Sequence, residues 1–229
     1  MIGWICLTAS PLNARQLDKE EYEAANRMSF SGTLLVYGNE PGYEFSLSYT
    51  RFLNCYIGIT GGIGFQHWLI DDYKPQWEVT DRYGRIYHRD DDDKDLMNLN
   101  VQIGPVFRLP LLTCGRDKDT TIAWECHPSV AFTFPNMKFS YLRKEQHNGR
   151  WEQQEIQVSN HGGQWNYWKL GNAICLQNDV INLSLGYAFS NQKPFSCVQD
   201  MRFDGKPINA AIPSKKITHE VRAAISFNF

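Results

Sequence analysis

The last twelve residues of the chain, THEVRAAISFNF (218–229), constrain its fold more than any other stretch. One set of alternate positions is apolar apart from His219, and the other set is polar or charged apart from Ala224. Successive side chains of a β-strand point to opposite faces, so this pattern predicts a strand with one apolar face and one polar face. The alternation runs up to Phe229, and we therefore expect that aromatic ring to belong to the apolar face.

The same period of two recurs along the chain at fairly regular spacing. In the segment 43–52, for example, Tyr43, Phe45 and Leu47 alternate with glutamate and serine. The segment 165–176 alternates less cleanly than the others. Together with the C-terminal strand, the sequence predicts strands over residues 29–37, 43–52, 55–68, 95–108, 121–135, 165–176 and 180–190.

The connections between these eight predicted strands alternate in length from the second onward. The shorter ones are 53–54, 109–120 and 177–179. The longer, hydrophilic ones are 69–94, 137–164 and 191–216, and the first connection, 39–42, is a short exception. Transmembrane barrels have short turns at one rim, long loops at the other and an even number of strands. The pattern therefore predicts an all-β, antiparallel, up-and-down eight-stranded transmembrane β-barrel, the one kind of sheet that leaves no unpaired edge in lipid.

Composition agrees with this class and excludes others. No run of about 18 apolar residues is present, which argues against a membrane-spanning helix. The formal net charge is −2 and the pI about 6.3, so nothing in the charge balance predicts a nucleic-acid partner. Aromatic residues make up 14% of the chain, a share that suits strands and membrane interfaces.

Alternation alone does not say which face of the barrel is apolar, because a soluble lipid-binding barrel has its apolar face inside. Three features favour an apolar outer face. Charged residues occupy the polar positions and would be costly against lipid. Glycines also concentrate there, as a narrow lumen requires, at Gly58, Gly62, Gly64, Gly104 and Gly186. Aromatic residues near the strand ends would form interfacial girdles, namely Tyr49, Trp124, Phe132, Phe134, Phe189, Phe227 and Phe229.

The N-terminal residues favour an exported protein. Residues 1–14 have an apolar stretch followed by small residues, and we interpret them as a signal peptide, shortened because it has no basic start. Residues 15–28 are expected to form a charged lead-in, helical or flexible, and residues 29–229 the barrel. The six cysteines include no Cys-x-x-Cys pair, which argues against a zinc site, although Cys114 and Cys175 remain free to pair with each other.

The alternating terminal strand VRAAISFNF, with its final Phe229, resembles the C-terminal signature of bacterial outer-membrane β-barrel proteins. The strand number and loop asymmetry are similar to those of small barrels of the OmpA/OmpX type and of the porin-like "outer membrane protein β-barrel" family. The resemblance covers about residues 29–229 and implies a location in the outer membrane of Gram-negative bacteria, surrounded by outer-membrane lipid. It also implies that the barrel-assembly machinery recognises the strand that ends at Phe229.

Several charged residues fall at mid-strand positions on the polar face. Buried charges must be paired, because an unpaired one costs several kcal/mol. We therefore predict an interior polar network that plugs the lumen. Its members are Glu44, Glu125, His127, Lys169, Glu220 and Arg222. An ion path along this network is the functional alternative, but eight strands leave a lumen that side chains just fill.

Two further motifs have a functional and a simpler interpretation. The pair His127 and Ser129 is similar to the His-x-Ser of outer-membrane lipid A deacylases, but Val130 stands where that family has Asn, and strand parity turns both residues inward. The turn-like stretches 148–151 and 160–165 would either present Trp151, Trp165 and Tyr167 to sugars or proteins, or form an interfacial belt. The run DDDDK (90–94) is expected to be a solvated loop rather than a calcium site.

The sequence thus predicts an outer-membrane barrel with a structural or surface-interaction role, acting through the loops 69–94, 137–164 and 191–216. We expect no enzymatic activity, cofactor or metal, and the surface ligand is not specified by the sequence. A narrow channel for small solutes is the first alternative, and a lipid A-modifying hydrolase that uses His127 and Ser129 is the second.

Overall fold

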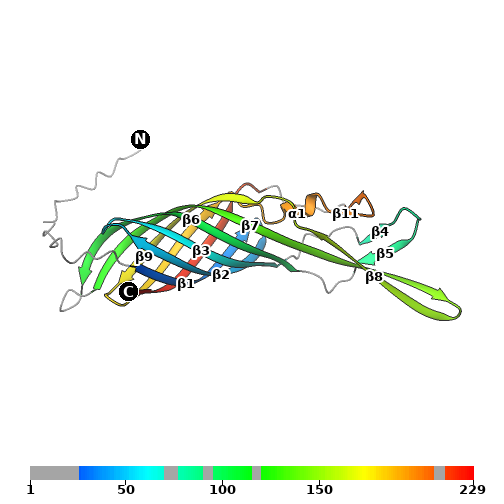
Figure 1. Ribbon diagram of the computed structural model, residues 1–229, viewed down its shortest axis with the longest axis horizontal. Coiled ribbons are helices and arrows are strands. Elements are labelled where there is room, and N and C mark those ends of the chain that lie inside the picture. The colour runs from blue at the N-terminus through cyan, green and yellow to red at the C-terminus, as the bar shows by residue number, and fades with distance from the viewer. Residues whose placement is uncertain (1–25, 70–76, 90–94, 115–119, 209–214) are drawn as a thin grey trace.

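The computed structural model describes residues 26–69, 77–89, 95–114, 120–208 and 215–229 (Figure 1). The predicted signal peptide, most of the charged lead-in and the DDDDK run lie outside these residues. Figure 1 shows an elongated molecule with a barrel on the left and a narrower extension on the right. Among the described residues, no helix has the length and apolar character needed to span a bilayer.

Eight antiparallel strands form the barrel. They are β1 (Asn26–Tyr37), β2 (Glu40–Phe52), β3 (Ile57–Leu69), β6 (Asp95–Cys114), β7 (Thr120–His147), β9 (Asn166–Gln177), β10 (Ile181–Ser190) and β13 (Thr218–Asn228). Their order around the wall is β7-β6-β3-β2-β1-β13-β10-β9, and β9 returns to β7. The first and last strands pair along ten positions, from Arg27 opposite Asn228 to Val36 opposite His219. The predicted closed, up-and-down eight-stranded barrel is confirmed.

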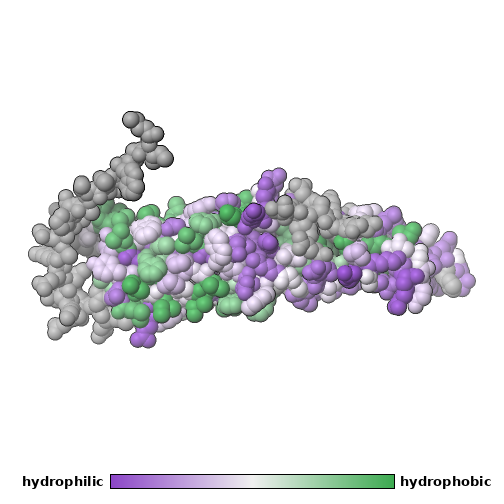
Figure 2. Space-filling model, turned by 90° about the horizontal axis from the view of Figure 1, so that it is seen from above, coloured by the Kyte–Doolittle hydropathy of each residue, from purple (hydrophilic) through white to green (hydrophobic). Residues whose placement is uncertain are grey.

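The apolar face of the barrel points outward, as predicted. Along β2 every residue of even number is buried and every residue of odd number is exposed, so that Glu44 is buried while Phe45 is 64% exposed. On the other side of the barrel, Leu185 is 65% and Val221 51% exposed. Hydrophobic side chains gather over the barrel, whereas hydrophilic ones prevail from the middle of the molecule to its opposite end (Figure 2).

Two of the inward glycines lie where a side chain would collide with the neighbouring strand. A Cβ added to Gly104 would lie 2.1 Å from the carbonyl oxygen of Pro128, and one added to Gly62 would lie 2.8 Å from the Cβ of Ser48. His219, the one polar residue in the apolar set of β13, lies near the long-loop rim. There its Nδ1 is 2.5 Å from the hydroxyl oxygen of Tyr187. This hydrogen bond explains how an imidazole is tolerated on the outer face.

The predicted connections are wrong in two respects. At the short-turn rim, residues 109–114 and Thr120 of the predicted loop belong to strands, because β6 continues to Cys114 and β7 starts at Thr120, with a register shift between Pro110 and Leu112. At the other rim, the long connections are largely folded. They contribute β4 (Glu78–Thr80), β5 (Ile86–Arg89), β8 (Arg150–Asn160), β11 (Arg202–Phe203), β12 (Lys206–Pro207) and the one-turn helix α1 (Ser196–Gln199).

These additional elements build the extension. Strand β7 continues past its last barrel pairing with β9, at Phe132, and turns at Asn148–Gly149 into β8. On its other side β5 pairs with β7 at Tyr141 and Leu142. Buried apolar residues of this small sheet pack against α1 and the β11–β12 hairpin. This core includes Tyr87, Phe139, Tyr141, Val158, Phe195, Val198, Met201 and Phe203.

The outward orientation predicts the effect of a charge on the outer face. Leu185 lies midway along β10, so Leu185→Arg should place a guanidinium near the centre of the bilayer. We expect it to lower the free energy of unfolding by about 2–4 kcal/mol, measured by denaturant titration of the barrel in lipid vesicles. The control, Val180→Arg, lies next to the short turn and should cost less than about 1 kcal/mol. Equal costs at the two positions would contradict a membrane-spanning outer face.

Candidate functional site

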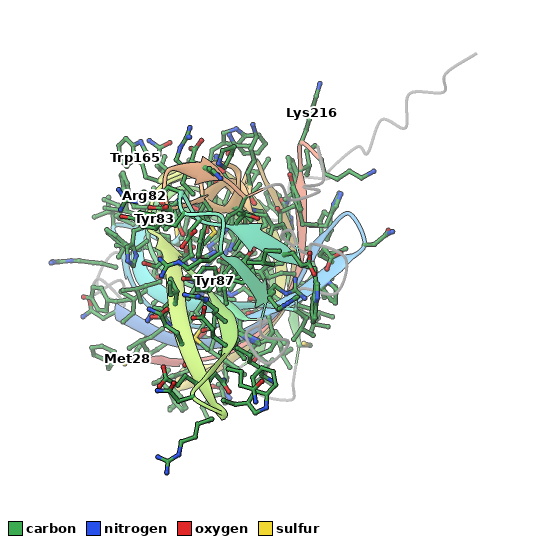
Figure 3. The ribbon with its side chains drawn as sticks, turned by 90° about the vertical axis from the view of Figure 1, so that its right-hand side faces the viewer. Met28, Arg82, Tyr83, Tyr87, Trp165 and Lys216 are labelled. Carbon is green, nitrogen blue, oxygen red and sulfur yellow. The ribbon has the colours of Figure 1, made fainter. Side chains whose placement is uncertain are left out.

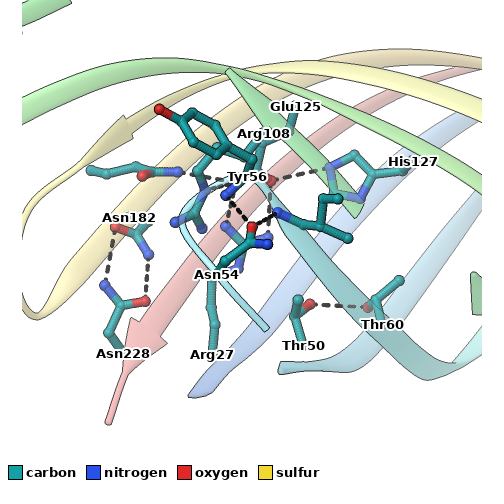
Figure 4. Close-up of polar contacts among 12 residues, drawn as sticks. Arg27, Thr50, Asn54, Tyr56, Thr60, Arg108, Glu125, His127, Asn182 and Asn228 are labelled. Carbon is teal, nitrogen blue, oxygen red and sulfur yellow. Dashed lines mark hydrogen bonds and ion pairs between the residues drawn. The ribbon is translucent and has the colours of Figure 1, made fainter. Parts of the chain in front are cut away.

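A cluster of polar side chains centred on Glu125 fills the short-turn half of the lumen (Figure 4). Arg27, from β1, donates from both terminal guanidinium nitrogens to the two Glu125 oxygens, at 2.7 and 2.9 Å. Arg108, from β6, donates from Nε to Oε1 at 2.9 Å. Because Glu125 is only 1% exposed, its carboxylate would be costly to bury alone, and it is neutralised by one cation from the neighbouring strand β6 and one from β1 across the lumen.

Further residues complete this cluster. His127 Nε2 lies 3.1 Å from Glu125 Oε2, and the Gln177 side-chain amide donates to Oε1 at 3.0 Å. The buried ring of Phe52 packs against both arginines, with its centroid 5.0 Å from the guanidinium carbon of Arg27 and 3.6 Å from that of Arg108. The arrangement leaves little open space at this end of the barrel.

A second cluster lies nearer the long-loop rim. The Lys169 ammonium from β9 forms an ion pair with Glu220 from β13, and its Nζ lies 4.0 Å from an oxygen of Glu44. The Glu44 carboxylate also accepts hydrogen bonds from the side-chain amides of Gln66, at 2.7 Å, and Asn100, at 3.4 Å. Glu44, Lys169 and Glu220 are all buried, so in this cluster one ammonium and two side-chain amides face two buried carboxylates.

Arg222 belongs to neither cluster. Within the described part of the chain no carboxylate lies within ion-pair distance of it, and its buried Nε has no hydrogen-bond partner. The two clusters and Arg222 together contain four cations and three carboxylates. The cations are Arg27, Arg108, Lys169 and Arg222, and the carboxylates are Glu44, Glu125 and Glu220. Among these seven side chains the cations outnumber the carboxylates by one; His127 and Glu40, a buried residue of β2 nearer the long-loop rim, are outside this count.

A cavity of about 60 Å³ lies between the two clusters. Arg27, His127, Ser129, Lys169 and Arg222 are among its lining residues. One water molecule occupies about 30 Å³ in the liquid, so this cavity has room for about two waters. This volume is far below that of a continuous aqueous passage through the barrel.

Above the polar clusters the inner wall becomes apolar. Leu35, Trp68 and Leu96 occupy inward positions at the long-loop ends of their strands, and each is fully buried. Phe195 packs against the rings of Trp68, at 5.8 Å, and Tyr37, at 6.0 Å. These contacts join the extension to the rim as one hydrophobic cluster, which caps the long-loop mouth of the lumen.

The structure places Glu125 and His127 in one group, Glu44, Lys169 and Glu220 in a second, and Arg222 beside the cavity between them. Four further residues of these clusters were not predicted, namely Arg27, Arg108, Gln66 and Phe52. Arg27 was assigned to the lead-in, and extending the polar parity of the first strand two residues before Ser29 would have identified it. Arg108 already lay at the end of the predicted strand 95–108, on its polar parity.

The structure also places the residues of the other motifs. His127 and Ser129 both line the lumen cavity, and among the described hydrogen bonds the imidazole contacts Glu125 and not Ser129. Tyr167 is buried, so it is not available at the surface, whereas Trp151 and Trp165 are 72% and 63% exposed. No group of three or more His, Cys, Asp or Glu side chains suited to a metal occurs in the described residues.

The pairing left open for Cys114 and Cys175 does not form. Both thiols are free, as are those of Cys55, Cys126 and Cys197. Cys175 is buried on the inner face, where it lies opposite Ala123 of β7, while Cys114 lies opposite Thr120 beyond the end of β9. The extension of β6 therefore carries Cys114 away from Cys175.

Aromatic side chains gather on the outer face near both rims. Tyr49 and Phe229 lie 6.4 Å apart, between ring centroids, at the short-turn rim. Trp168 packs edge-on against Phe189, and Phe132 stacks with Trp165, both pairs at 5.8 Å and near the opposite rim. Aromatic residues near both rims, an apolar band between them and a closed polar interior are features of transmembrane β-barrels. The chain folds as a transmembrane β-barrel of eight strands.

Comparison with solved structures returns barrels of similar extent at low identity. Ail, the attachment invasion locus protein of Yersinia pestis, has 10% identity and a TM-score of 0.39, over 90% of this chain and 99% of that one. Neisserial surface protein A has 9% identity and a TM-score of 0.38, over 90% and 96%. The N-terminal barrel domain of Pseudomonas aeruginosa OprF has 8% identity and a TM-score of 0.36, over 90% and 98%. No protein-family model and no curated protein matches the chain.

The two lumen groups predict unequal effects of removing a charge. Glu125→Gln keeps the side-chain shape but leaves Arg27 and Arg108 buried without a counter-charge, so we expect the free energy of unfolding to fall by about 3–5 kcal/mol. Arg222→Gln removes a cation that has no carboxylate partner, and we expect a change below about 1 kcal/mol. Denaturant unfolding in vesicles measures both, and equal losses would contradict the assignment of Glu125 as the centre of the network.

Proposed function

We propose that the protein is a sealed, non-enzymatic barrel that holds a folded extension at the cell surface for structural or interaction roles. The observation that carries this proposal is the filling of the lumen along its length. Charged side chains occupy the middle and the short-turn end, and the extension's hydrophobic core covers the other mouth. A barrel of eight strands offers little space for transport even before these residues are considered.

The extension supports the surface-interaction part of the proposal. Its strands, helix and buried core give it a defined shape, and such a shape is needed to present a binding surface. His127 is engaged with Glu125 and faces the lumen, which favours a structural role for this residue over the alternative of lipid A hydrolysis. The narrow channel is likewise disfavoured, because the remaining cavity holds about two waters.

Electrical recording tests the sealed state. Purified protein inserted into planar bilayers in concentrated potassium chloride should produce no steady conductance steps, because ions would have to enter a lumen blocked at both ends. A wide porin inserted into the same bilayers is the positive control. Steady unitary steps from the wild-type protein would refute the sealed barrel and favour the narrow channel.

We also propose that β13, with its terminal Phe229, is the segment recognised by the barrel-assembly machinery in cells. This proposal is supported by the alternation of apolar and polar residues along β13 and by the position of Phe229, which is 67% exposed at the short-turn rim. Phe134 is a suitable control, because it is similarly exposed, at 59%, but lies near the opposite rim.

Replacing the terminal ring should impair assembly more than stability. We expect Phe229→Ala to lower the amount of folded barrel in the outer membrane several-fold, with Phe134→Ala close to wild type. The gel-mobility shift between unheated and boiled samples reports the folded fraction. Equal yields of the two variants would argue against recognition through Phe229.

A further inference from the structure

The extension contains a cleft of about 450 Å³ on its solvent-exposed surface. Its walls come from the turn between β4 and β5, from β8 and from the β11–β12 hairpin. The polar lining residues are Asp81, Arg82, Arg85, Gln157, Arg202 and Asp204. Figure 3 looks onto this end of the molecule, where Arg82 and Tyr83 lie next to each other. The volume falls within the 300–1,000 Å³ typical of small-molecule sites.

Two of the arginines are held in place by the residues around them. Arg85 Nε donates to Asp81 at 2.6 Å, and Arg82 Nε lies 3.3 Å from an Asp204 oxygen. Both guanidinium groups also pack against the ring of Tyr83. The guanidinium carbon lies 5.3 Å from the ring centroid in Arg82 and 5.2 Å in Arg85. Side chains that are already oriented lose less entropy when a ligand binds.

Asp81 fixes the turn that carries these residues. One of its carboxylate oxygens accepts hydrogen bonds from the backbone amides of Tyr83 and Arg85, both at 2.9 Å. Burial acts to raise the pKa of Asp81, but these hydrogen bonds and the Arg85 side chain outweigh it and hold the pKa below its ordinary value. Asp81 is thus a structural anion that organises the turn.

The cleft retains a positive excess after its internal pairs are counted. Arg82, Arg85 and Arg202 line it, and the Lys206 ammonium donates to the backbone carbonyl of Asp81 at 3.3 Å. Two carboxylates, Asp81 and Asp204, oppose these four cations, which leaves a formal charge of +2. The described carboxylate contacts engage Nε of Arg82 and Arg85, and Arg82 is 69% exposed. The terminal guanidinium nitrogens of Arg82 and Arg85 can therefore reach a ligand.

The position of the cleft places it outside the lipid. Its β8 wall pairs with β7 between Lys138 and Tyr141, six to nine residues beyond Phe132, the last β7 residue that pairs with β9, and past Met137, the last that pairs with β6. That separation corresponds to roughly 20–30 Å along the strand. The ligand is thus to be sought among molecules above the membrane rather than among phospholipid headgroups.

We propose that this cleft binds an anionic saccharide, whose sulfate, phosphate or carboxylate groups are held by Arg82, Arg85 and Arg202. Guanidinium groups match the geometry of such oxyanions and bind them in a bidentate manner. The side chains of Gln157 and Ser159 also line the cleft and supply hydrogen-bonding groups for sugar hydroxyls. A protein partner would need about 800 Å² of contact surface, far more than the cleft offers. The inference rests on the proposed surface-interaction function and deepens it.

Titration of the full-length barrel in detergent with a sulfated tetrasaccharide tests the proposal. We expect saturable binding by calorimetry, weakened by salt, and no binding of the unsulfated tetrasaccharide. Arg202→Gln should weaken binding about tenfold, and it leaves both arginine–aspartate pairs intact. Arg82→Gln should have a comparable effect. Arg150→Gln is the matched control, since it removes the same charge from the exposed β7–β8 turn, and it should bind within about twofold of wild type.

The outcomes separate the proposal from its alternatives. Equal loss with Arg150→Gln and Arg202→Gln, or equal binding of sulfated and unsulfated sugars, would overturn the cleft assignment. If vesicles that contain lipopolysaccharide compete with the tetrasaccharide, the natural saccharide is the membrane's own glycolipid. If they do not compete, it is a soluble or host glycan, and both results support the cleft. A conducting barrel would refute the sealed state without affecting this binding test.

Discussion

The structure depends on closure of one hydrogen-bonded sheet. Backbone groups cannot be left unpaired in hydrocarbon, so every strand of the wall needs two neighbours. Here the N-terminal strand β1 pairs with the C-terminal strand β13, and β9 pairs with β7. Once the ring is closed, the alternation of each strand divides its side chains between lipid and lumen. The apolar band, the girdles and the buried charges all follow from that division.

A closed ring of eight strands leaves a lumen in which polar groups have little water, and the chain satisfies them in two ways. Glu125 and Glu44 gather cations and amides from strands far apart in the sequence, such as Arg27, 98 residues from Glu125. Toward the long-loop mouth, the inward positions change to apolar residues such as Leu35 and Trp68, which need no polar partner. Arg222 is the exception. In the described residues it has no carboxylate within ion-pair distance.

The fold was predictable because its determinants are local. Alternation in stretches such as 43–52 fixes both the strand and the face that each residue occupies, and a closed barrel is the only arrangement compatible with many such strands in lipid. Gly62 and Gly104 indicated a narrow lumen for the same reason. The identities of the interior residues were predicted by parity, but their grouping was not, because it depends on how strands are staggered around the ring.

What the sequence did not reveal is mostly in the extension. Hydrophilic composition was interpreted as loop, yet Tyr87, Tyr141, Phe195 and Phe203 lie within those stretches and form a core. Short strands such as β4 and β5 have too few residues for a clear alternation, and their pairing depends on contacts distant in sequence. A local signal did exist at the rim. Leu35, Trp68 and Leu96 are apolar residues at inward positions, and they mark where the lumen is covered.

Strand β7 has 28 residues and spans roughly 90 Å if fully extended, from the short-turn rim to the tip of the extension. This one strand therefore links the membrane-embedded wall to the small sheet that carries the arginine cleft. The height of the proposed binding surface above the membrane is thus set by the number of residues of β7 that lie beyond the barrel.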